Sequence, residues 1–300
     1  MYLEKVNGPE DIKKLNLDEL NELAKETRGA LINKISNVGG HSGPNLGMVE
    51  MTVALHYVFN SPVDKIVFDV SHQCYPHKIL TGRKDAYLYE EHFKDVTGYT
   101  NPKESEHDLF KIGHTSTSIS LALGLAKARD LKNEKENVIA IIGDGSLSGG
   151  EALEALDYAG EYDKNLIIIV NDNDQSIAEN HGGIYKTLRN LRETNGKCEN
   201  NLFESFNLEY HYLDDGHDIK KLIELFESVK DIDHPVVLHI HTIKGKGLKY
   251  AEENREAWHA GGPFNVEDGS PKFAVQKGDT TVFDSLKNLL DTNKEAVVVN

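Results

Sequence analysis

The segment Val138–Asn180, VIAIIGDGSLSGGEALEALDYAGEYDKNLIIIVNDNDQSIAEN, carries the clearest structural pattern in this chain. It opens with an apolar, β-branched run over 138–142 that stops at Gly-Asp-Gly, which is typical of a buried parallel strand followed by a tight turn. A helical pattern comes next, and a second apolar run over 166–170 ends in Asn-Asp-Asn. Strand, crossover helix and parallel strand make one βαβ unit, so Asp144 and Asn173 should emerge at the same edge of the sheet.

The residue types at this edge suit a metal ion that is shared with phosphate. Mg²⁺ takes about six oxygen ligands and usually binds one or two carboxylates together with substrate phosphates. Asp144 offers a charged oxygen and Asn173 an amide oxygen, while Gly143 and Gly145 let the backbone approach a ligand closely. Gly-Asp-Gly alone also fits an ordinary βα turn with Asp as the helix cap. The separation, 173 − 144 = 29 residues, leaves room for one helix and one strand and favours a metal-diphosphate site.

Longer motifs carry a resemblance to a known family. Gly-Asp-Gly followed at this distance by a strand ending in Asn resembles the thiamine diphosphate motif of the transketolase superfamily. The segments DVSHQCYPHKILTGRKD and SEHDLFKIGHTSTSIS are similar to the 1-deoxy-D-xylulose-5-phosphate synthase family, and the match runs from about Leu17 to about Phe264. It implies an α/β fold, doubly wound, with a mostly parallel sheet and helices on both faces.

The resemblance also implies cofactors and their contacts. Thiamine diphosphate and Mg²⁺ are expected, with the metal held by Asp144, Asn173 and the backbone carbonyl of Gln175, and with Ile177 against the cofactor rings. The other implied cofactor contacts are His72, His114, Ser116, Gly143, Gly145, Ser146 and Lys244.

Some of these contacts have simpler explanations. Ser116 or Thr117 could merely cap the helix that follows, and the lysine at 244 could belong to a basic β-turn in water. The spacing of Lys244 from His259, 259 − 244 = 15 residues, agrees with the family and favours a diphosphate contact.

The resemblance implies three catalytic histidines. His41 and His259 would face the substrate, for protonation or hydrogen bonding, and His72 could bond a phosphate or relay a proton. His41 could instead be a solvated loop residue. This chain also departs from the family on the substrate side, because Pro44 stands where a Ser is usual and the residues around His259 differ. A related ketol-transfer enzyme is therefore an open alternative.

The implied reaction is condensation of pyruvate with glyceraldehyde 3-phosphate to 1-deoxy-D-xylulose 5-phosphate, with release of CO₂. In the family, a Glu on a second, pyrimidine-binding domain activates the cofactor. We expect residues 1–264 to form the diphosphate-binding domain and 265–300 to form a linker and the start of that second domain. The chain is then a fragment, the subunit of a split transketolase, or a catalytically silent binding module. A homodimer is the family's habit.

Composition limits the partners. The 300 residues include 33 basic and 49 acidic ones, and the net charge of −16 argues against nucleic acid or an anionic membrane as the main partner. Two cysteines and a charged, polar start without a hydrophobic run fit a reduced cytoplasm. Small-molecule substrates are the expected partners.

The rest of the chain gives a coarse map of elements. Helices are predicted over Asp18–Ser36, Met48–Phe59, Ser118–Leu131, Asp218–Val229 and part of Thr280–Asn300. Further strands are predicted over Lys65–Val70, Leu208–Leu213, Pro235–Thr242 and the closing VVVN. Two stretches read as irregular: 83–108, with short helical pieces and solvated charges, and 182–201, which looks too irregular for the core.

Overall fold

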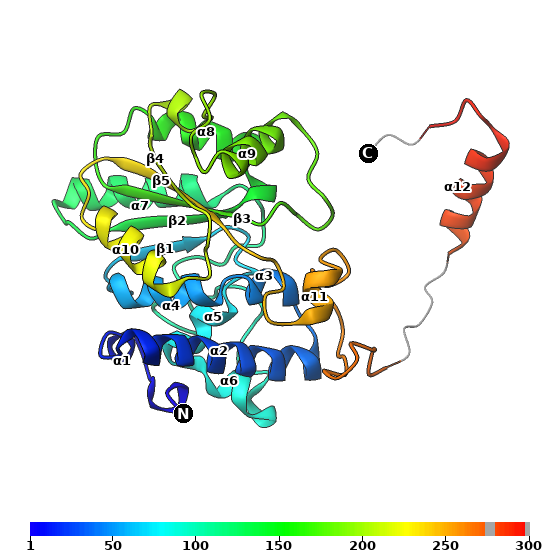
Figure 1. The fold of residues 1–300 in the computed structure, drawn as a ribbon, viewed down its shortest axis with the longest axis horizontal. Coiled ribbons are helices and arrows are strands. Elements are labelled where there is room, and N and C mark those ends of the chain that lie inside the picture. Colours follow the sequence, from blue (N-terminus) through cyan, green and yellow to red (C-terminus); the bar gives the residue numbers. More distant parts are fainter. Residues whose placement is uncertain (274–279, 298–300) are drawn as a thin grey trace.

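A parallel sheet organises the protein, which we describe from a computed structural model covering residues 1–273 and 280–297. Five strands pair in the order β1-β2-β3-β5-β4, and every neighbouring pair is parallel (Figure 1). The strands are β1 (Lys65–Phe68), β2 (Val138–Gly143), β3 (Leu166–Asp172), β4 (Glu209–Leu213) and β5 (Pro235–His241). The predicted doubly wound α/β fold is confirmed.

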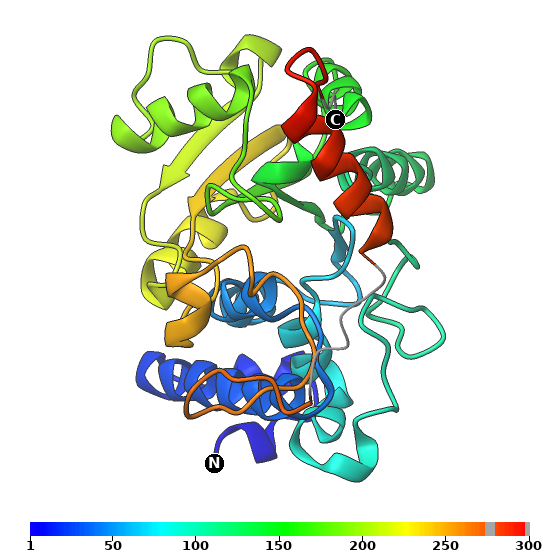
Figure 2. The ribbon, with the colours of Figure 1, turned by 90° about the vertical axis from the view of Figure 1, so that its right-hand side faces the viewer.

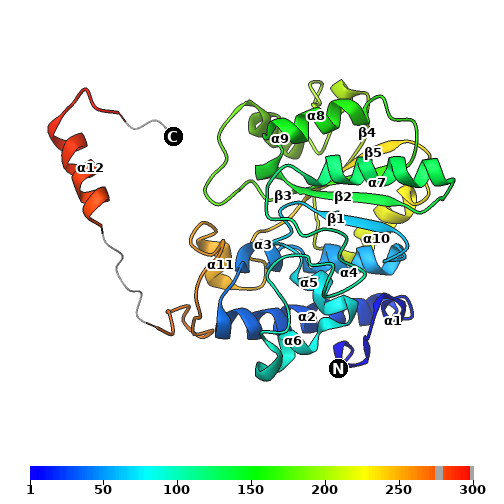
Figure 3. The same ribbon diagram turned by 180° about the vertical axis from the view of Figure 1, so that it is seen from behind.

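Helices cover both faces of this sheet, as Figures 1 and 3 show from opposite sides. The α-helices of the described residues are α1 (Pro9–Ile12), α2 (Leu17–Val38), α3 (Ser42–Leu46), α4 (Val49–Val58), α5 (Tyr75–Lys78), α6 (Asp85–Leu88), α7 (Ser118–Lys132), α8 (Gly150–Ala159), α9 (Gly183–Glu193), α10 (Ile219–Val229), α11 (Lys249–Glu253) and α12 (Thr281–Thr292), of which α12 lies apart from the sheet. Helices α2, α4 and α10 share one hydrophobic cluster with the sheet, and α7, α8 and α9 share another.

The two clusters follow from the alternation of side chains along buried strands. In β2, Ile139 and Ile141 join the cluster of α2 and α4, whereas Ala140 and Ile142 join the cluster of α7 and α8. Helices cover both faces of the sheet, so the strand side chains are buried on either side. This explains why the predicted strands are unbroken apolar runs rather than an alternation of apolar and polar residues.

The N-terminus of α7 is capped from a distance. We expected a hydroxyl of Ser116 or Thr117 to cap it, but neither does. The carboxylate of Asp69, just after β1, accepts hydrogen bonds from the backbone N–H groups of Ser116, Thr117 and Ser118 at 2.8–3.0 Å. A buried anion at a helix N-terminus satisfies the free amides and the helix dipole together.

Strand β1 is shorter than predicted because the chain turns at Val70 and Ser71. Both residues have positive φ, 56° and 65°. A β-branched residue in this region is strained, and its neighbours must hold it there. The turn brings His72 to the carboxyl edge of the sheet.

The prediction that 182–201 is too irregular for the core is wrong. Helix α9 occupies Gly183–Glu193, and its side chains Tyr185, Leu188 and Leu191 lie in the core. The apolar side chains recur every three residues, which is a helical spacing. Charged and amide residues lie between them and two glycines precede them, so the helix was not predicted.

Residues 83–108 do contain short helical pieces, including α6, as predicted. Their charges, however, are not simply solvated. Arg83 binds Asp108 through two hydrogen bonds of 2.7 and 2.9 Å, and Glu104 accepts one from the fully buried Lys78.

The C-terminal part leaves the sheet after β5. A loop over 254–273 passes the end of α2, where the backbone N–H of Phe264 donates to the carbonyl of Ser36 (Figure 2). The predicted helix after 280 is confirmed as α12. Of the predicted linker, residues 274–279 lie outside the described residues, and so do 298–300 of the predicted final strand. The domain boundary at 264 stays a prediction. Among the described residues, no helix combines the length and apolarity needed to span a bilayer.

Candidate active site

A cavity of about 460 Å³ opens at the carboxyl edge of the sheet, beyond the ends of β1, β2, β3 and β5. Open α/β sheets bind their ligands at this edge. The residues that line it are His41, Pro44, Val70, His72, Gln73, Thr115, Gly143, Asp144, Gly145, Ser146, Asn173, Gln175, Ser176, Ile177, Ala178, Lys244 and His259.

Two ends of this cavity differ in chemistry. We call the part formed by Asp144, Asn173 and Gln175 the carboxylate end, and the part formed by His41, His72 and His259 the histidine end. All six residues are candidates from the sequence. They come from segments that are far apart along the chain, from the residue before α3 to the segment after β5.

At the carboxylate end, Asp144 and Asn173 follow neighbouring strands. Gly143 of β2 lies opposite Asn171 of β3, so the two loops start level with each other. Asp144 is 1% exposed and accepts a hydrogen bond of 2.6 Å from the side-chain amide of Asn180. Burial, and then the nearby carboxylate of Asp172, raise the pKa of Asp144 well above its usual value. A cation at this point would remove that penalty.

Unpartnered oxygens face the same region. The side-chain oxygens of Asn173 and Gln175 are buried and have no hydrogen-bond partner within the described part of the chain. Buried polar atoms are normally paired, so such atoms at a cavity wall indicate a ligand. Hard oxygen donors next to a carboxylate fit Mg²⁺.

Close packing shapes the floor of the carboxylate end. A Cβ placed on Gly145 would lie 2.5 Å from the Cβ of Ser176, so only glycine fits this contact. At Gly143 a Cβ would meet nothing within 4 Å among the described residues. The hydroxyl of Tyr185 on α9 lies within hydrogen-bond distance of the carbonyl of Gly145, at 3.2 Å, and of the hydroxyl of Ser148, at 2.8 Å. The helix that the sequence did not predict therefore supports the Gly-Asp-Gly turn.

A buried ion-pair network lies directly behind the carboxylate end. The guanidinium of Arg192 on α9 bridges Asp172 and Asp174, with N–O distances of 2.6 Å to each. His239 donates to the same Asp172 at 2.7 Å. Burial alone would raise the pKa of Asp172, but the hydrogen bond from His239 and the charge of Arg192 lower it to about 2. The residues on either side of Asn173 are thus fixed by charge.

Lys244 lies between the two ends and is 1% exposed. Its Nζ donates to the backbone carbonyl of Ser176 at 2.6 Å. Burial lowers the pKa of Lys244 to about 8, while the carboxylate of Asp144 acts in the opposite sense. A lysine that is costly to charge here would be stabilised by an anionic ligand.

The histidine end is a cluster of three imidazoles. The ring centroids lie 5.1 Å apart for His41 and His72, 5.7 Å for His41 and His259, and 5.5 Å for His72 and His259. The ring of Tyr99, from the 83–108 segment, lies 5.8 Å from His41.

Burial keeps these imidazoles uncharged. It lowers the pKa of His41, and burial together with the other imidazoles lowers the pKa of His72 to about 3. Burial, Lys244 and His41 lower the pKa of His259 to about 4. The Nδ1 atoms of His72 and His259 are buried and unpartnered among the described residues, so both can bond a ligand.

Two predicted cofactor contacts lie outside the lining of the cavity. Ser116 is buried, and its hydroxyl donates to the carbonyl of Ser146 at 2.7 Å. His114 is exposed, and its Nδ1 bonds the carbonyl of Thr115. Thr115 lies between them and does line the cavity. Their roles as cofactor contacts stay predictions. His77, expected to be structural, is fully buried and bonded to His56 and Asp108.

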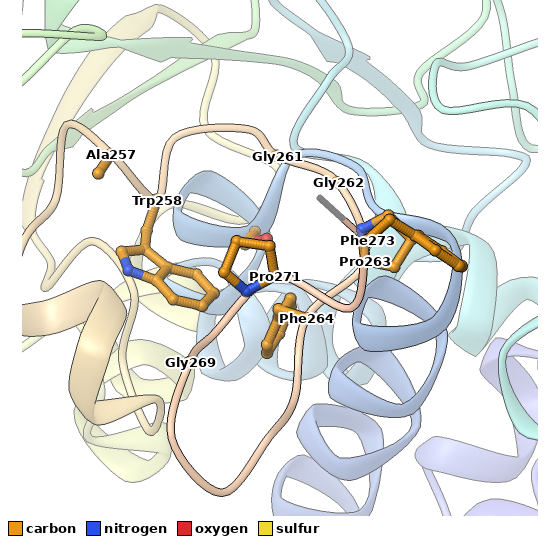
Figure 4. Close-up of a pocket in the computed structure, with 10 residues that line it drawn as sticks. Ala257, Trp258, Gly261, Gly262, Pro263, Phe264, Gly269, Pro271 and Phe273 are labelled. Atoms are coloured by element: carbon orange, nitrogen blue, oxygen red, sulfur yellow. The ribbon is translucent and has the colours of Figure 1, made fainter. Parts of the chain in front are cut away.

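A second cavity, of about 490 Å³, is lined by Ser42 and by residues between 257 and 273, and is drawn in Figure 4. Its lining is apolar, with Trp258, Phe264 and Phe273 among small residues and prolines, and it contains no charged side chain among the described residues. The ring of Phe264 meets Trp258 edge-on at 4.7 Å. This cavity does not suit a diphosphate. It instead backs the loop that carries His259.

The fold is that of the transketolase-like α/β class. Among solved structures, transketolase from Campylobacter jejuni subsp. jejuni is similar, with a TM-score of 0.63 and 20% identity over 83% of this chain and 41% of that one. Transketolase from Leishmania mexicana has a TM-score of 0.64 and 17% identity over 91% of this chain and 44% of that one.

Within that class the chain belongs to the 1-deoxy-D-xylulose-5-phosphate synthase family. The family model of that description matches residues 3–199 and 194–242. The 1-deoxy-D-xylulose-5-phosphate synthase of Listeria monocytogenes serotype 4b is 44% identical over 98% of this chain and 50% of its own, and that of Caldanaerobacter subterraneus subsp. tengcongensis is 43% identical over 93% and 50%. The chain thus spans about half the length of these curated relatives.

Proposed function

We propose that this chain supplies the metal-diphosphate half of a thiamine diphosphate site that condenses pyruvate with glyceraldehyde 3-phosphate, giving 1-deoxy-D-xylulose 5-phosphate and CO₂. One observation carries the proposal. Asp144 and Asn173, from the ends of neighbouring parallel strands, line one cavity together with the buried ammonium of Lys244.

The carboxylate end would hold Mg²⁺ and the diphosphate. Asp144 and the unpartnered oxygen of Asn173 would be the side-chain ligands of the metal. The backbone carbonyl of Gln175 would be the third ligand. The buried ammonium of Lys244 would neutralise a phosphate oxygen.

At the histidine end, the chain's own groups orient the substrate. Bound thiamine diphosphate would supply the carbon nucleophile that the reaction of pyruvate needs. His41, His72 and His259 are neutral near pH 7, because their pKa values lie below the usual range. Each can donate one hydrogen bond and accept another, so they can hold a carbonyl or hydroxyl oxygen and transfer a proton to it.

The pyrimidine side of the cofactor needs a second domain, either in the same polypeptide or in a separate subunit. The alternative is the diphosphate-binding subunit of a split transketolase, which would use the same half-site. Pro44, where the family usually has Ser, lines the cavity, so the departure from the family lies on the substrate side. We expect small-molecule substrates, a cytoplasmic location and a homodimer.

Calorimetry with thiamine diphosphate tests the half-site directly. Binding should require Mg²⁺ and should vanish in Asp144→Ala. If the wild-type protein with its complementary domain does not bind, or binds equally well without Mg²⁺, the chain is a catalytically silent module. Product analysis on that complete protein tests the substrates. CO₂ release from pyruvate with glyceraldehyde 3-phosphate supports the synthase reaction, and transfer from a ketose phosphate without CO₂ supports a transketolase.

A further inference from the structure

We propose that Asn45 is a positioning residue that sets the spacing of His41 and His72 at the histidine end. The inference rests on the proposed function, since it assigns those histidines to the substrate. Asn45 lies in α3 and does not line the cavity, so it acts only through the two loops that it joins.

One buried amide makes three hydrogen bonds to these loops. Asn45 is 0% exposed. Its Nδ2 donates to the backbone carbonyl of His41 at 2.7 Å and to the backbone carbonyl of His72 at 2.7 Å. Its Oδ1 accepts from the backbone N–H of Tyr75 at 2.8 Å. Both donor hydrogens and the acceptor oxygen are therefore used.

These contacts join two segments that are far apart in the sequence, and a longer hydrogen bond of 3.4 Å, from the backbone N–H of His41 to the hydroxyl of Tyr75, adds to them. His41 precedes α3, and His72 follows the strained turn after β1. Holding both carbonyls with one rigid, planar group fixes the two backbones relative to each other, and the rings then meet edge-on with centroids 5.1 Å apart.

The chemistry of the bonds restricts the residue type. Only a primary amide offers two N–H donors and an acceptor from one short group. An ionised Asp has no donor and would repel both carbonyls, and Ser has one donor. Gln carries the same amide but adds a methylene in a fully buried place.

The third histidine is held by different bonds. Gly40 and Gly261 exchange two backbone hydrogen bonds of 2.9 and 3.0 Å, and Gly43 donates to the carbonyl of Trp258 at 2.8 Å. Loss of the Asn45 amide should therefore loosen His72 relative to His41, while the His41 and His259 loops remain clamped.

Asn33 supplies a matched control. Its Nδ2 also donates to two backbone carbonyls, those of Tyr87 at 2.9 Å and Leu88 at 3.2 Å, but it lies on α2 and lines neither the main cavity nor the apolar one. Asn33→Ser removes the same kind of bonds without touching the histidine loops.

The test uses NMR on the full chain labelled at histidine, without cofactor or substrate. The wild-type protein should give a cross-ring NOE between His41 and His72, assigned with His41→Gln and His72→Gln. Asn45→Ser should lose or strongly weaken this NOE, and Asn33→Ser should retain it. A folded Asn45→Ser variant that keeps the full NOE overturns the proposal.

A measurement on the wild-type protein decides the matter if Asn45→Ser does not fold. The side-chain amide protons of Asn45 should exchange with solvent far more slowly than those of exposed asparagines. Fast exchange would overturn the proposal, because the amide would then not be holding the two carbonyls.

Calorimetry separates this inference from the proposed function. In Asn45→Ser, Mg²⁺-dependent binding of thiamine diphosphate should persist, while the complete protein should show a raised KM for pyruvate or a lowered kcat. Absence of diphosphate binding in the wild-type protein would end the proposed function and would leave the NOE result to judge Asn45.

Discussion

Gly145 and Ser176 touch so closely that a Cβ at position 145 would lie 2.5 Å from the Cβ of Ser176 and 2.9 Å from its Cα. The Gly-Asp-Gly turn and the loop after β3 are therefore packed backbone to backbone. Gly145→Ala must displace that loop, and we expect it to lower the free energy of unfolding by about 1–3 kcal/mol and to weaken Mg²⁺-dependent diphosphate binding. Urea denaturation and calorimetry measure the two effects.

Gly143→Ala is the control for the stability effect. The added Cβ meets nothing within 4 Å among the described residues, and the backbone there is extended, with φ of −76°. Its free energy of unfolding should stay within about 0.5 kcal/mol of the wild-type value. Equal losses in the two variants would contradict the close contact.

Asp144→Asn should separate folding from metal binding. The asparagine side chain keeps an acceptor oxygen. The substitution removes a carboxyl group whose pKa is raised well above the usual value by burial and by the nearby Asp172. Without metal, the thermal midpoint near pH 7 should be unchanged or higher, because a buried charge is lost. With Mg²⁺ and thiamine diphosphate, the stabilisation seen in the wild-type protein should disappear. A variant that loses stability without metal yet still responds to Mg²⁺ would argue against Asp144 as a metal ligand.

Arg192→Met should be among the costly substitutions on α9. The substitution removes one of the two ion-pair partners of the fully buried Asp172 carboxylate. His239 is the partner that remains among the described residues. Removing one partner of a buried ion pair costs about 3 kcal/mol, which urea denaturation can measure. Arg189, exposed on the same helix, gives the matched variant Arg189→Met. That substitution should change the free energy of unfolding by less than about 0.5 kcal/mol.

Stability should fall as the pH is lowered from 7 to 5. Burial and neighbouring imidazoles lower the pKa of His72 to about 3, and burial with nearby positive groups lowers those of His259 and His107 to about 4. Unfolded histidines titrate near 6.5, so the unfolded chain binds more protons over this range and is favoured. The raised pKa of Asp144 acts in the opposite sense. The free energy of unfolding should therefore be measured at pH 7, 6 and 5 in the Asp144→Asn variant. Adding His72→Gln to that variant should make the loss of stability between pH 7 and pH 5 smaller. A pH-independent free energy of unfolding there would count against the burial of these rings.

Most of the fold was predictable because the central strands are unbroken apolar runs. Such runs occur when both faces of a parallel sheet are covered. The details that failed depend on contacts between distant segments. No local pattern shows that Asp69 caps α7 or that Lys78 pairs with Glu104. Helix α9 could have been found from the spacing of Tyr185, Leu188 and Leu191.

The site was predictable where residue type and strand ends coincide, as at Asp144 and Asn173. Supporting residues escaped because their role is defined by their partners. Asn180, which bonds Asp144, lies at the end of the quoted stretch and carried no signal apart from its nearness. Arg192 lies in a segment that reads as a surface, and its function is visible only once Asp172 and Asp174 are seen beside it. Asn45 looks like any polar residue in a glycine-rich loop.

Trp258 is the chain's only tryptophan. It immediately precedes His259 and stacks on Tyr250, with ring centroids 6.1 Å apart. Ultraviolet emission excited at the red edge of protein absorption therefore comes from a single indole on the loop that carries His259. The protein contains its own optical reporter of that loop, readable in a stopped-flow cuvette without a dye or a tag.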